Sequence, residues 1–395
     1  MFNEEEKRAL RKIRDRSLEM IDAVTLDNGA LLASPPGTRF PYVYPRDAAL
    51  ILRVLNELGE SEKVKTTLGF LAGAQSETGE WTQRYDKEGN AASYKPPQLD
   101  GVGLILHAFG QYYGKTKDEA FLERVWENIN SGMQYIAFHY IPESKIIFSV
   151  NGLHEWPPME AGFDIWGNVC CYAGMKAGIG IAQALGKEEA GPWQEMADNL
   201  WIGITSRLVS GGRFVKLRSG HRDIDDPDVT EMAPYVVGAI TAGDPVMRKT
   251  ADFITQELWD DELGGVKRCY VEYAMPARDN GGHGPYSQYT GWMGQYWVDA
   301  GNYERARACA DWFLRYNRDG LLPEHVATKE RFDSWVQRAK KAGRFAKAGR
   351  WTAARNVMDS EEYQEQGLVL WVVPLTWGHA EFLMFCHRME EKGWL

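Results

Sequence analysis

Hydrophobic positions recur along this chain at the spacing of amphipathic helices, in twelve segments. Short, glycine-containing connections alternate with long ones between these segments. Long connections without secondary structure of their own usually bind or catalyse. If successive helices alternate in direction, the long connections meet at one end, and we expect the functional site there. The predicted helices span residues 3–24, 47–58, 60–76, 99–113, 117–138, 165–185, 189–209, 230–241, 246–259, 286–300, 303–316 and 376–391.

This alternation favours an all-α fold, an (α/α)6 barrel of twelve helices with inner and outer rings and the active site at one end. The inner helices are apolar on more than one face, as helices buried all round should be. An α-solenoid is the alternative, but the sequence shows no convincing repeat. We expect a single domain over 1–395, in which 325–373 form a long loop or helical insertion over the active-site face. Short strands are predicted at 146–150 and 213–217.

Composition narrows the class of protein. The chain has 395 residues, of which 44% are hydrophobic, enough for one large core. Its net charge of −10 disfavours nucleic acid as a partner, because nucleic acid requires a basic surface. No segment approaches the roughly 18 apolar residues of a membrane span, and the charged N-terminus lacks an apolar signal region. We therefore expect a cytoplasmic protein that does not enter the membrane.

Cysteine and histidine usage gives no sign of a metal centre. The five cysteines and eight histidines lack the spacing of a metal motif, so we expect no metal and no cofactor. Calcium at the acidic run 223–228 is an alternative to an exposed acidic loop, which is the simpler interpretation. The 15 Trp, 18 Tyr and 15 Phe mostly indicate a large core, although several would suit stacking on sugar rings. The oligomeric state cannot be read from the sequence.

Two polar clusters directly precede predicted helices. Arg46 and Asp47 either pair and cap the helix that follows, or grip vicinal hydroxyl groups of a sugar, and the residues alone leave both open. Asp100 opens the next such helix in the same way, with an aromatic and polar wall before it. The candidate substrate-binding residues of these clusters are Tyr44, Arg46, Asp47, Trp81, Gln98 and Asp100.

Two glutamates in later long connections are candidate catalytic groups. Glu155 lies between His154 and Trp156, and partial burial beside aromatic surface would raise its pKa and keep a proton available. Glu324 lies in a turn of another long connection. Each could instead be an exposed loop residue. Together they suggest glycoside hydrolysis, which uses two carboxyl groups flanking the scissile bond.

With these residues in view, the whole chain resembles the catalytic domain of glycoside hydrolase family 15, the group of glucoamylases, glucodextranases and trehalases. The resemblance implies that Glu155 is the general acid, that Glu324 is the catalytic base, and that Arg46 and Asp47 hold the terminal sugar. Arg268 and Trp377 are further candidate binding residues, as are His154 and Trp156. The motifs, in order, are Tyr-Pro-Arg-Asp (44–47), Pro-Gln-Leu-Asp-Gly (97–101), Gly-Leu-His-Glu (152–155), Leu-Pro-Glu (322–324) and Pro-Leu-Thr-Trp-Gly-His-Ala (374–380).

Three positions depart from the family's pattern. His154 replaces the usual Trp before the acid, and Trp156 replaces the acidic residue that commonly follows. His325 stands where Gln or an acid often follows the base. These departures leave the catalytic class intact but leave the sugar and its linkage open.

We therefore predict an inverting, exo-acting α-glycosidase of carbohydrate metabolism. It would remove a terminal α-linked sugar, with glucose as the expected one, from an oligosaccharide or small glycoside. One alternative is another α/α-barrel sugar enzyme, either uronate-processing or an epimerase that uses paired histidines such as His154 and His379. The other is a non-catalytic carbohydrate-binding barrel. The segment 327–356, with a net charge of +7, is either a solvated helix or a lid that favours an anionic glycoside.

Overall fold

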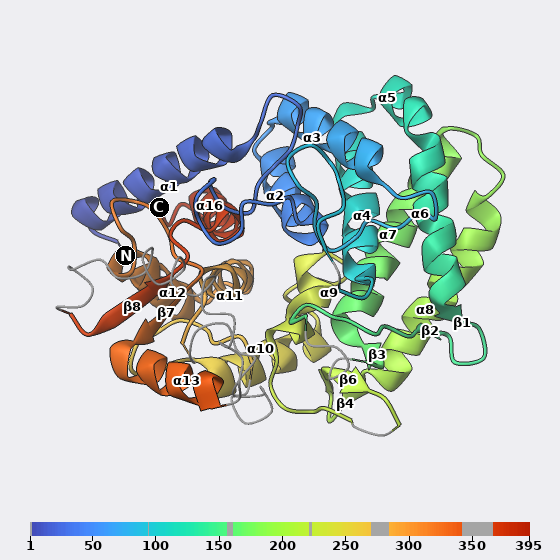
Figure 1. Cartoon of the computed structure of the whole chain (residues 1–395). Coiled ribbons are helices and arrows are strands. Elements are labelled where there is room, and N and C mark those ends of the chain that lie inside the picture. The colour runs from blue at the N-terminus through green and yellow to red at the C-terminus, as the bar shows by residue number, and fades with distance from the viewer. Residues whose placement is uncertain (1, 94, 156–160, 221–222, 270–283, 342–365) are drawn as a thin grey trace.

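The computed structural model describes residues 2–93, 95–155, 161–220, 223–269, 284–341 and 366–395, and its helices are arranged in a ring (Figure 1). Helices of an outer layer and an inner layer alternate along the chain. The inner helices are α2 (Pro45–Glu57), α4 (Leu99–Thr116), α7 (Ile165–Ala184), α9 (Ala233–Val236), α11 (Ser287–Asp299) and α16 (Thr376–Glu391). The outer helices are α1 (Glu4–Val24), α3 (Ser61–Ala74), α5 (Glu119–Arg124), α6 (Trp126–His139), α8 (Ala190–Arg207), α10 (Pro245–Leu258) and α12 (Tyr303–Arg315).

Burial separates the two layers. Every residue of α11 from Ser287 to Val298 is buried, which requires a helix surrounded on all sides. Helix α1 instead buries one stripe that includes Leu10, Ile13 and Met20, and its remaining positions are largely polar. Inner helices such as α11 therefore lack a polar face because they are buried on all sides, whereas outer helices such as α1 keep polar positions on the side that faces solvent.

The inner ring closes on itself. Helix α16 packs against α2, the first inner helix, and α9 meets α11 through the rings of Tyr235 and Tyr296, whose centroids are 5.2 Å apart. Helices α4 and α7 approach so closely that a Cβ on Gly103 would lie 2.4 Å from the carbonyl carbon of Cys170. The predicted closed barrel is confirmed, and the solenoid alternative is wrong.

Two predicted helices differ from those in the structure. The segment 117–138 is divided at Val125 into α5 and α6, and Asp118 caps α5 by accepting a hydrogen bond from an amide of its first turn. The segment 230–241 contains only a 3₁₀ turn (Val229–Met232) and the short α9, because Gly238 takes a φ of +71° just beyond the end of that helix. Neither change disturbs the alternation of inner and outer helices.

Strands are short and lie outside the barrel wall. Residues 146–147 and 213–218 contain strand residues, as the sequence predicts, but in shorter pieces. The antiparallel pairs are β1 (Tyr140–Ile141) with β2 (Ile146–Ile147), β3 (Phe163–Asp164) with β6 (Leu217–Arg218), β4 (Val209–Ser210) with β5 (Arg213–Phe214), and β7 (His325–Thr328) with β8 (Leu368–Trp371).

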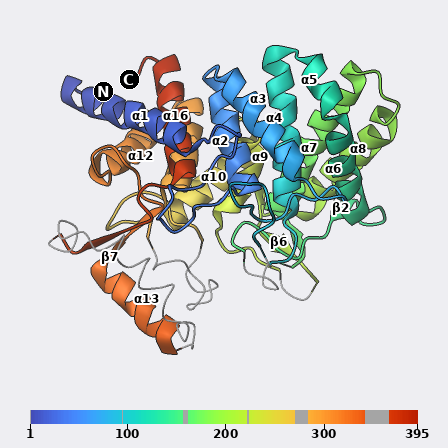
Figure 2. The ribbon, with the colours of Figure 1, turned by 45° about the horizontal axis from the view of Figure 1, so that its top comes forward.

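The pair of β7 and β8 forms the base of the insertion predicted at 325–373. Helix α13 (Lys329–Lys341) follows β7 directly, and residues 342–365 lie outside the described part of the chain. Figure 2 shows β7 and α13 at the end of the barrel that carries the long connections, whereas both termini lie toward the opposite end. Among the described helices, none combines the length and apolar character that crossing a membrane would require.

Candidate active site

The first turns of three inner helices meet at one cavity. Arg46 and Asp47 belong to the first turn of α2, Gln288 and Tyr289 to that of α11, and Trp377 to that of α16. Helix N-termini carry partial positive charge and free amide groups, so they favour carboxylates and hydroxyl oxygens. The site is therefore built on rigid helix ends, with the two candidate catalytic glutamates supplied by the connections.

Both candidate glutamates border this cavity, which has a volume of about 80 Å³. That is small beside the roughly 300–1,000 Å³ of ordinary ligand pockets, so side chains at its mouth must move to admit a sugar ring. A larger cavity of about 650 Å³, lined by Arg53 and Arg388 among others, borders neither glutamate. The smaller cavity is therefore the candidate active site, because both carboxyl groups border it. The smaller cavity is lined by Phe40, Tyr44, Arg46, Asp47, Leu153, His154, Glu155, Arg268, Gln288, Tyr289, Glu324, Leu375 and Trp377.

The carboxylate of Glu155 lies between two cations. Lys95 Nζ is 2.5 Å from its Oε2, Arg46 Nη2 is 3.2 Å from its Oε1, and Gln83 donates a further hydrogen bond to Oε2. Burial alone would raise the pKa of Glu155, but the charges of Lys95 and Arg46 outweigh burial and lower the pKa to about 2. The raised pKa expected from the sequence is therefore wrong for this arrangement, because the sequence pattern did not reveal the two cations.

Glu324 is positioned through its backbone. Its amide donates to the carbonyl oxygens of Trp371 (2.8 Å) and Val372 (3.0 Å), and its carbonyl accepts from the Ser287 amide at 2.9 Å. Its side chain is buried, with the residue 7% exposed. The β7–β8 ladder and the start of α11 thus fix the residue from both sides.

The buried side chain of His379 holds the connection that carries Glu324. His379 Nε2 accepts from the Leu322 amide at 3.0 Å, and His379 Nδ1 lies 2.7 Å from Ser17 Oγ. Burial lowers the pKa of His379 to about 3, so the ring is neutral, and because Nε2 accepts, Nδ1 carries the hydrogen and donates to Ser17. Within the motif 374–380, the histidine therefore holds the chain two residues before Glu324.

Arg46 and Asp47 form a buried pair at the floor of the site. Arg46 Nε lies 3.2 Å from Asp47 Oδ1 and its Nη1 lies 3.7 Å from Asp100 Oδ2. Burial raises the pKa of Asp47 to about 6 even though Arg46 lowers it. Asp47 accepts no capping hydrogen bond from α2, so the capping alternative has no support, while pairing with Arg46 is observed.

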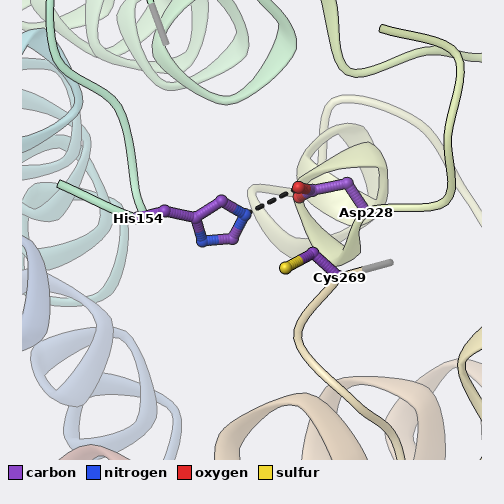
Figure 3. A group of neighbouring side chains, drawn as sticks. All are labelled: His154, Asp228 and Cys269. Atoms are coloured by element: carbon purple, nitrogen blue, oxygen red, sulfur yellow. Dashed lines mark hydrogen bonds and ion pairs between the residues drawn. The ribbon is translucent and has the colours of Figure 1, made fainter. Parts of the chain in front are cut away.

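His154 belongs to a buried polar network behind Glu155. Its Nε2 is 2.6 Å from Asp228 Oδ2 (Figure 3), and Arg268 Nε donates to its Nδ1 at 2.6 Å. Arg268 Nη2 also donates to the Leu153 carbonyl at 3.0 Å, and Lys216 Nζ lies 3.9 Å from Asp228. Burial of His154 lowers its pKa, which keeps the ring neutral. The network fixes residues 153–154 and thereby the position of Glu155.

The spacing of His154, Asp228 and Cys269 would allow a metal ion, since one ligand atom from each lies within 4.8 Å of the others (Figure 3). The hydrogen bonds argue against that use. Nδ1 accepts from Arg268, so Nε2 carries the hydrogen and donates to Asp228, and neither nitrogen offers a free lone pair. Two neighbouring cations, Arg268 and Lys216, would also repel a metal ion.

Some of the other predicted binding residues line the cavity, and others are buried behind it. Trp81 is fully buried and donates from its indole nitrogen to the Leu71 carbonyl, and Gln98 donates to the Gly152 carbonyl at 2.7 Å. Asp100 accepts from the indole of Trp166 at 2.7 Å. These three do not line the cavity, whereas Tyr44, Arg268, His154 and Trp377 do. Direct sugar contact by any of them stays a prediction, and Trp156 lies outside the described residues.

Three residues that sequence reasoning did not single out belong to the site. Gln288 and Tyr289 line the cavity from α11, and Lys95 contacts Glu155 from the connection before α4. The first two stand at the start of a predicted inner helix, directly after a long connection, which is the signal that identified Arg46 and Asp47. Lys95 carried no such signal, because a lone lysine in a polar loop is ordinarily solvated.

Comparison with known proteins identifies the class. The sequence model of glycosyl hydrolases family 15 matches residues 16–387, and the chain belongs to that family. An uncharacterized glycosyl hydrolase of Methanocaldococcus jannaschii is 21% identical over 96% of the chain, and trehalase 2 of Sulfolobus acidocaldarius is 23% identical over 60%. The chain spans 56% and 39% of the length of these two relatives.

Solved structures of similar proteins show the same fold. A glycosidase superposes with a TM-score of 0.76 at 19% identity and covers 99% of both chains. A bacterial glucoamylase complexed with acarbose gives 0.70 at 17% identity, covering 96% of this chain and 55% of that one. The glucoamylase of Saccharomycopsis fibuligera gives 0.68 at 13% identity, with 99% and 96% covered. The resemblance and fold class read from the sequence are confirmed.

Proposed function

We propose that the protein is an inverting, exo-acting α-glycosidase that releases a terminal α-linked sugar from an oligosaccharide or small glycoside. The observation that carries this proposal is that Glu155 and Glu324 border one cavity together with Arg46 and Asp47. Two carboxyl groups that face one substrate site are what glycoside hydrolysis requires. The trehalase and glucoamylase names of similar proteins favour glucose as that sugar.

Each residue has a chemical role in this proposal. Glu155, once protonated, donates its proton to the glycosidic oxygen as the bond breaks. Glu324, ionised, takes a proton from the water that attacks the anomeric carbon from the opposite face. Arg46 and Asp47 donate to and accept from hydroxyl groups of the bound sugar, and Trp377 and Tyr289 border its ring.

Exo action is supported by the burial of the inner end of the cavity. Arg46, Asp47 and Tyr289, which border it, are each less than one tenth exposed, so a chain of sugars has no path past them. Once the side chains at the mouth have moved, such an end would take one sugar unit, with its leaving group directed toward solvent.

The stereochemistry of the product tests the proposal. Incubation with α,α-trehalose, isomaltose and maltose, followed by proton NMR during the first minutes, should show β-glucose appearing before mutarotation. With α,α-trehalose, inversion releases one β-glucose together with the α-glucose of the leaving group, whereas retention releases α-glucose alone. Release without early β-glucose would therefore indicate retention and a carboxyl separation of about 5 Å, against the roughly 6.5–9.5 Å of inverting enzymes. Release of internal oligosaccharides from a maltodextrin would contradict exo action.

The epimerase alternative finds no support at two of its four candidate histidines, His154 and His379; His283 lies outside the described residues. Both ring nitrogens of His154 and of His379 are engaged in hydrogen bonds with protein groups, so neither ring is free to abstract a proton from a sugar. The same NMR experiment would detect an epimerised sugar directly.

A further inference from the structure

The acid proposed above is ionised in this arrangement. A general acid must carry its proton at the start of the reaction, yet the pKa of Glu155 is lowered to about 2 because Lys95 and Arg46 together outweigh its burial. Both cations contact the carboxylate directly, Lys95 at 2.5 Å and Arg46 at 3.2 Å, so withdrawal of either one would favour the protonated acid. The cation that can withdraw would need a new partner, and the chemistry of that partner would define the class of substrate.

The two cations are anchored very differently. The Arg46 side chain is 10% exposed, and it also contacts Asp47 and Asp100. The Lys95 side chain is 30% exposed, and among the described residues its ammonium contacts only Glu155, at Oε2 (2.5 Å) and at the backbone oxygen (3.5 Å). A lysine ammonium on a four-carbon stem reorients easily. Lys95 is the cation that can leave.

Lys95 lies on the outer side of Glu155. Arg46 borders the cavity and Lys95 does not, so the sugar side of Glu155 faces Arg46 and the more exposed side faces Lys95. In an exo-acting enzyme the leaving group departs toward solvent, past this exposed side. A second cation lies near the cavity, since Arg84 Nη1 donates at 3.3 Å to the hydroxyl oxygen of Tyr44, which borders it. Lys95 and Arg84 therefore add positive charge on the more exposed side of Glu155, toward which the proposed leaving group departs.

We propose that Lys95 determines specificity by binding an acidic group, a carboxylate or a phosphate, on the leaving group of the glycoside. This inference rests on the proposed role of Glu155. The acidic group draws the Lys95 ammonium away from Glu155, and Glu155 then takes up one proton from solvent. That proton passes to the glycosidic oxygen as the bond breaks, while Glu324 accepts a proton from the attacking water and returns it to solvent. One water is consumed, and the net proton balance is zero.

Matched substrates test the proposal. α-Glucosylglycerate and α-glucosylglycerol differ only in a carboxylate, and trehalose 6-phosphate and trehalose differ only in a phosphate. A charged hydrogen bond gained by the acidic member should give it a kcat/KM about 10-fold to 100-fold higher in the wild type. Lys95→Gln should remove the preference, and Lys95→Arg should keep part of it. Equal wild-type rates within both pairs, or an unchanged ratio in Lys95→Gln, would overturn the proposal.

The pH profile separates this role from a merely structural one. Removing the Lys95 charge lets Glu155 keep its proton to higher pH, so the basic limb of kcat/KM for the neutral substrate should move upward in Lys95→Gln. Lys87→Gln is the matched control, because Lys87 is an exposed lysine of the same connection paired with Glu88 at 3.6 Å. It should leave rates and profile unchanged. Loss of all hydrolysis in a folded Lys95→Gln would make Lys95 itself the proton donor and refute the proposal.

A binding measurement keeps the test independent of turnover. In the presence of glucose, D-glycerate and inorganic phosphate should each bind the wild type with uptake of about one proton and bind Lys95→Gln about tenfold more weakly. Equal binding to both proteins would reject the role of Lys95, whatever the enzyme hydrolyses. If the proposed function fails instead, Glu155→Gln and Glu324→Gln will hydrolyse both members of each pair as the wild type does.

Discussion

The two carboxylates of the site are held in opposite ways. Glu155 is controlled by side chains: Lys95, Arg46 and Gln83 contact its carboxylate, and its own backbone has a φ of +58°, in the left-handed region. Glu324 is controlled by backbone, through hydrogen bonds to Trp371, Val372 and Ser287. These side-chain contacts set the proton affinity of the Glu155 carboxylate, and these hydrogen bonds set the position of the Glu324 backbone.

This difference matches what the proposed chemistry demands of each group. A base needs only to be ionised, which is the ordinary state of a glutamate near neutral pH, and to face the attacking water from a fixed point. An acid must gain a proton that an ordinary glutamate lacks, so its surroundings must change between binding and reaction. Movement of side chains would change the proton affinity of Glu155, and backbone hydrogen bonds would keep Glu324 in place.

The largest expected effect separates the two roles. Glu155→Gln and Glu324→Gln should each reduce kcat on an unactivated α-glucoside by about 10²–10⁴-fold, as loss of a general acid or base does. With α-glucosyl fluoride, whose leaving group needs no proton, Glu155→Gln should recover most of its rate, whereas Glu324→Gln should not. Steady-state rates on both substrates measure this difference.

Thermal unfolding of both variants is the control for this comparison. A recovery on the fluoride by Glu324→Gln rather than by Glu155→Gln would exchange the assigned roles. Recovery by neither variant would show that Glu155 acts other than by donating a proton.

Stability against pH gives the next largest effect. The pKa of Glu155 is lowered from 4.5 to about 2 on folding, so the carboxylate adds stability that is fully present above pH 4.5 and is lost as the pH falls toward 2. The wild type should exceed Glu155→Gln in free energy of unfolding by about 3 kcal/mol at pH 7, and by much less at pH 2.5. Chemical denaturation at the two pH values measures this, with Glu88→Gln as an exposed control. A gap that is constant with pH would show that the cations do not stabilise the carboxylate.

The sequence predicted the fold well because burial leaves a direct trace in residue pattern. Fully buried helices such as α11 lack polar faces, and the glycines of short connections mark helix ends. The break at Val125 left no such trace, since no glycine or proline stands there. The short α9 was overextended because the effect of Gly238 depends on its positive φ, which the sequence does not display.

The sequence identified individual residues of the site but not the contacts between them. Motif positions brought Arg46, Asp47, Glu155 and Glu324 into view, and they border one cavity. The contact of Lys95 with Glu155 joins two connections 60 residues apart, and nothing in either segment indicates it. The pKa of Glu155 depends on that contact, so its direction could not be predicted from its neighbours in sequence.

A smaller effect should follow from loosening Glu324 alone. His379→Phe removes the acceptor for the Leu322 amide and the partner of Ser17, and an unsatisfied buried amide costs about 1–3 kcal/mol. We expect a free energy of unfolding lower by about 2 kcal/mol and a reduced kcat, with the basic limb of the pH profile unmoved. His387→Phe, on the outward side of the same helix, is the control. A shifted basic limb would mean that His379 influences the acid as well as the base.

The smallest effect concerns the connection that carries Glu155. Gln98→Leu keeps the shape of the side chain but removes its hydrogen bond to the Gly152 carbonyl, worth about 1 kcal/mol. Since Gln98 supports this connection from behind the cavity, kcat should fall several-fold while KM stays nearly constant. Gln134→Leu, which removes an exposed hydrogen bond to Asn130 on α6, should change neither. A raised KM with unchanged kcat would instead mean that Gln98 contacts the sugar, as the motif suggested, and that the connection needs no such support.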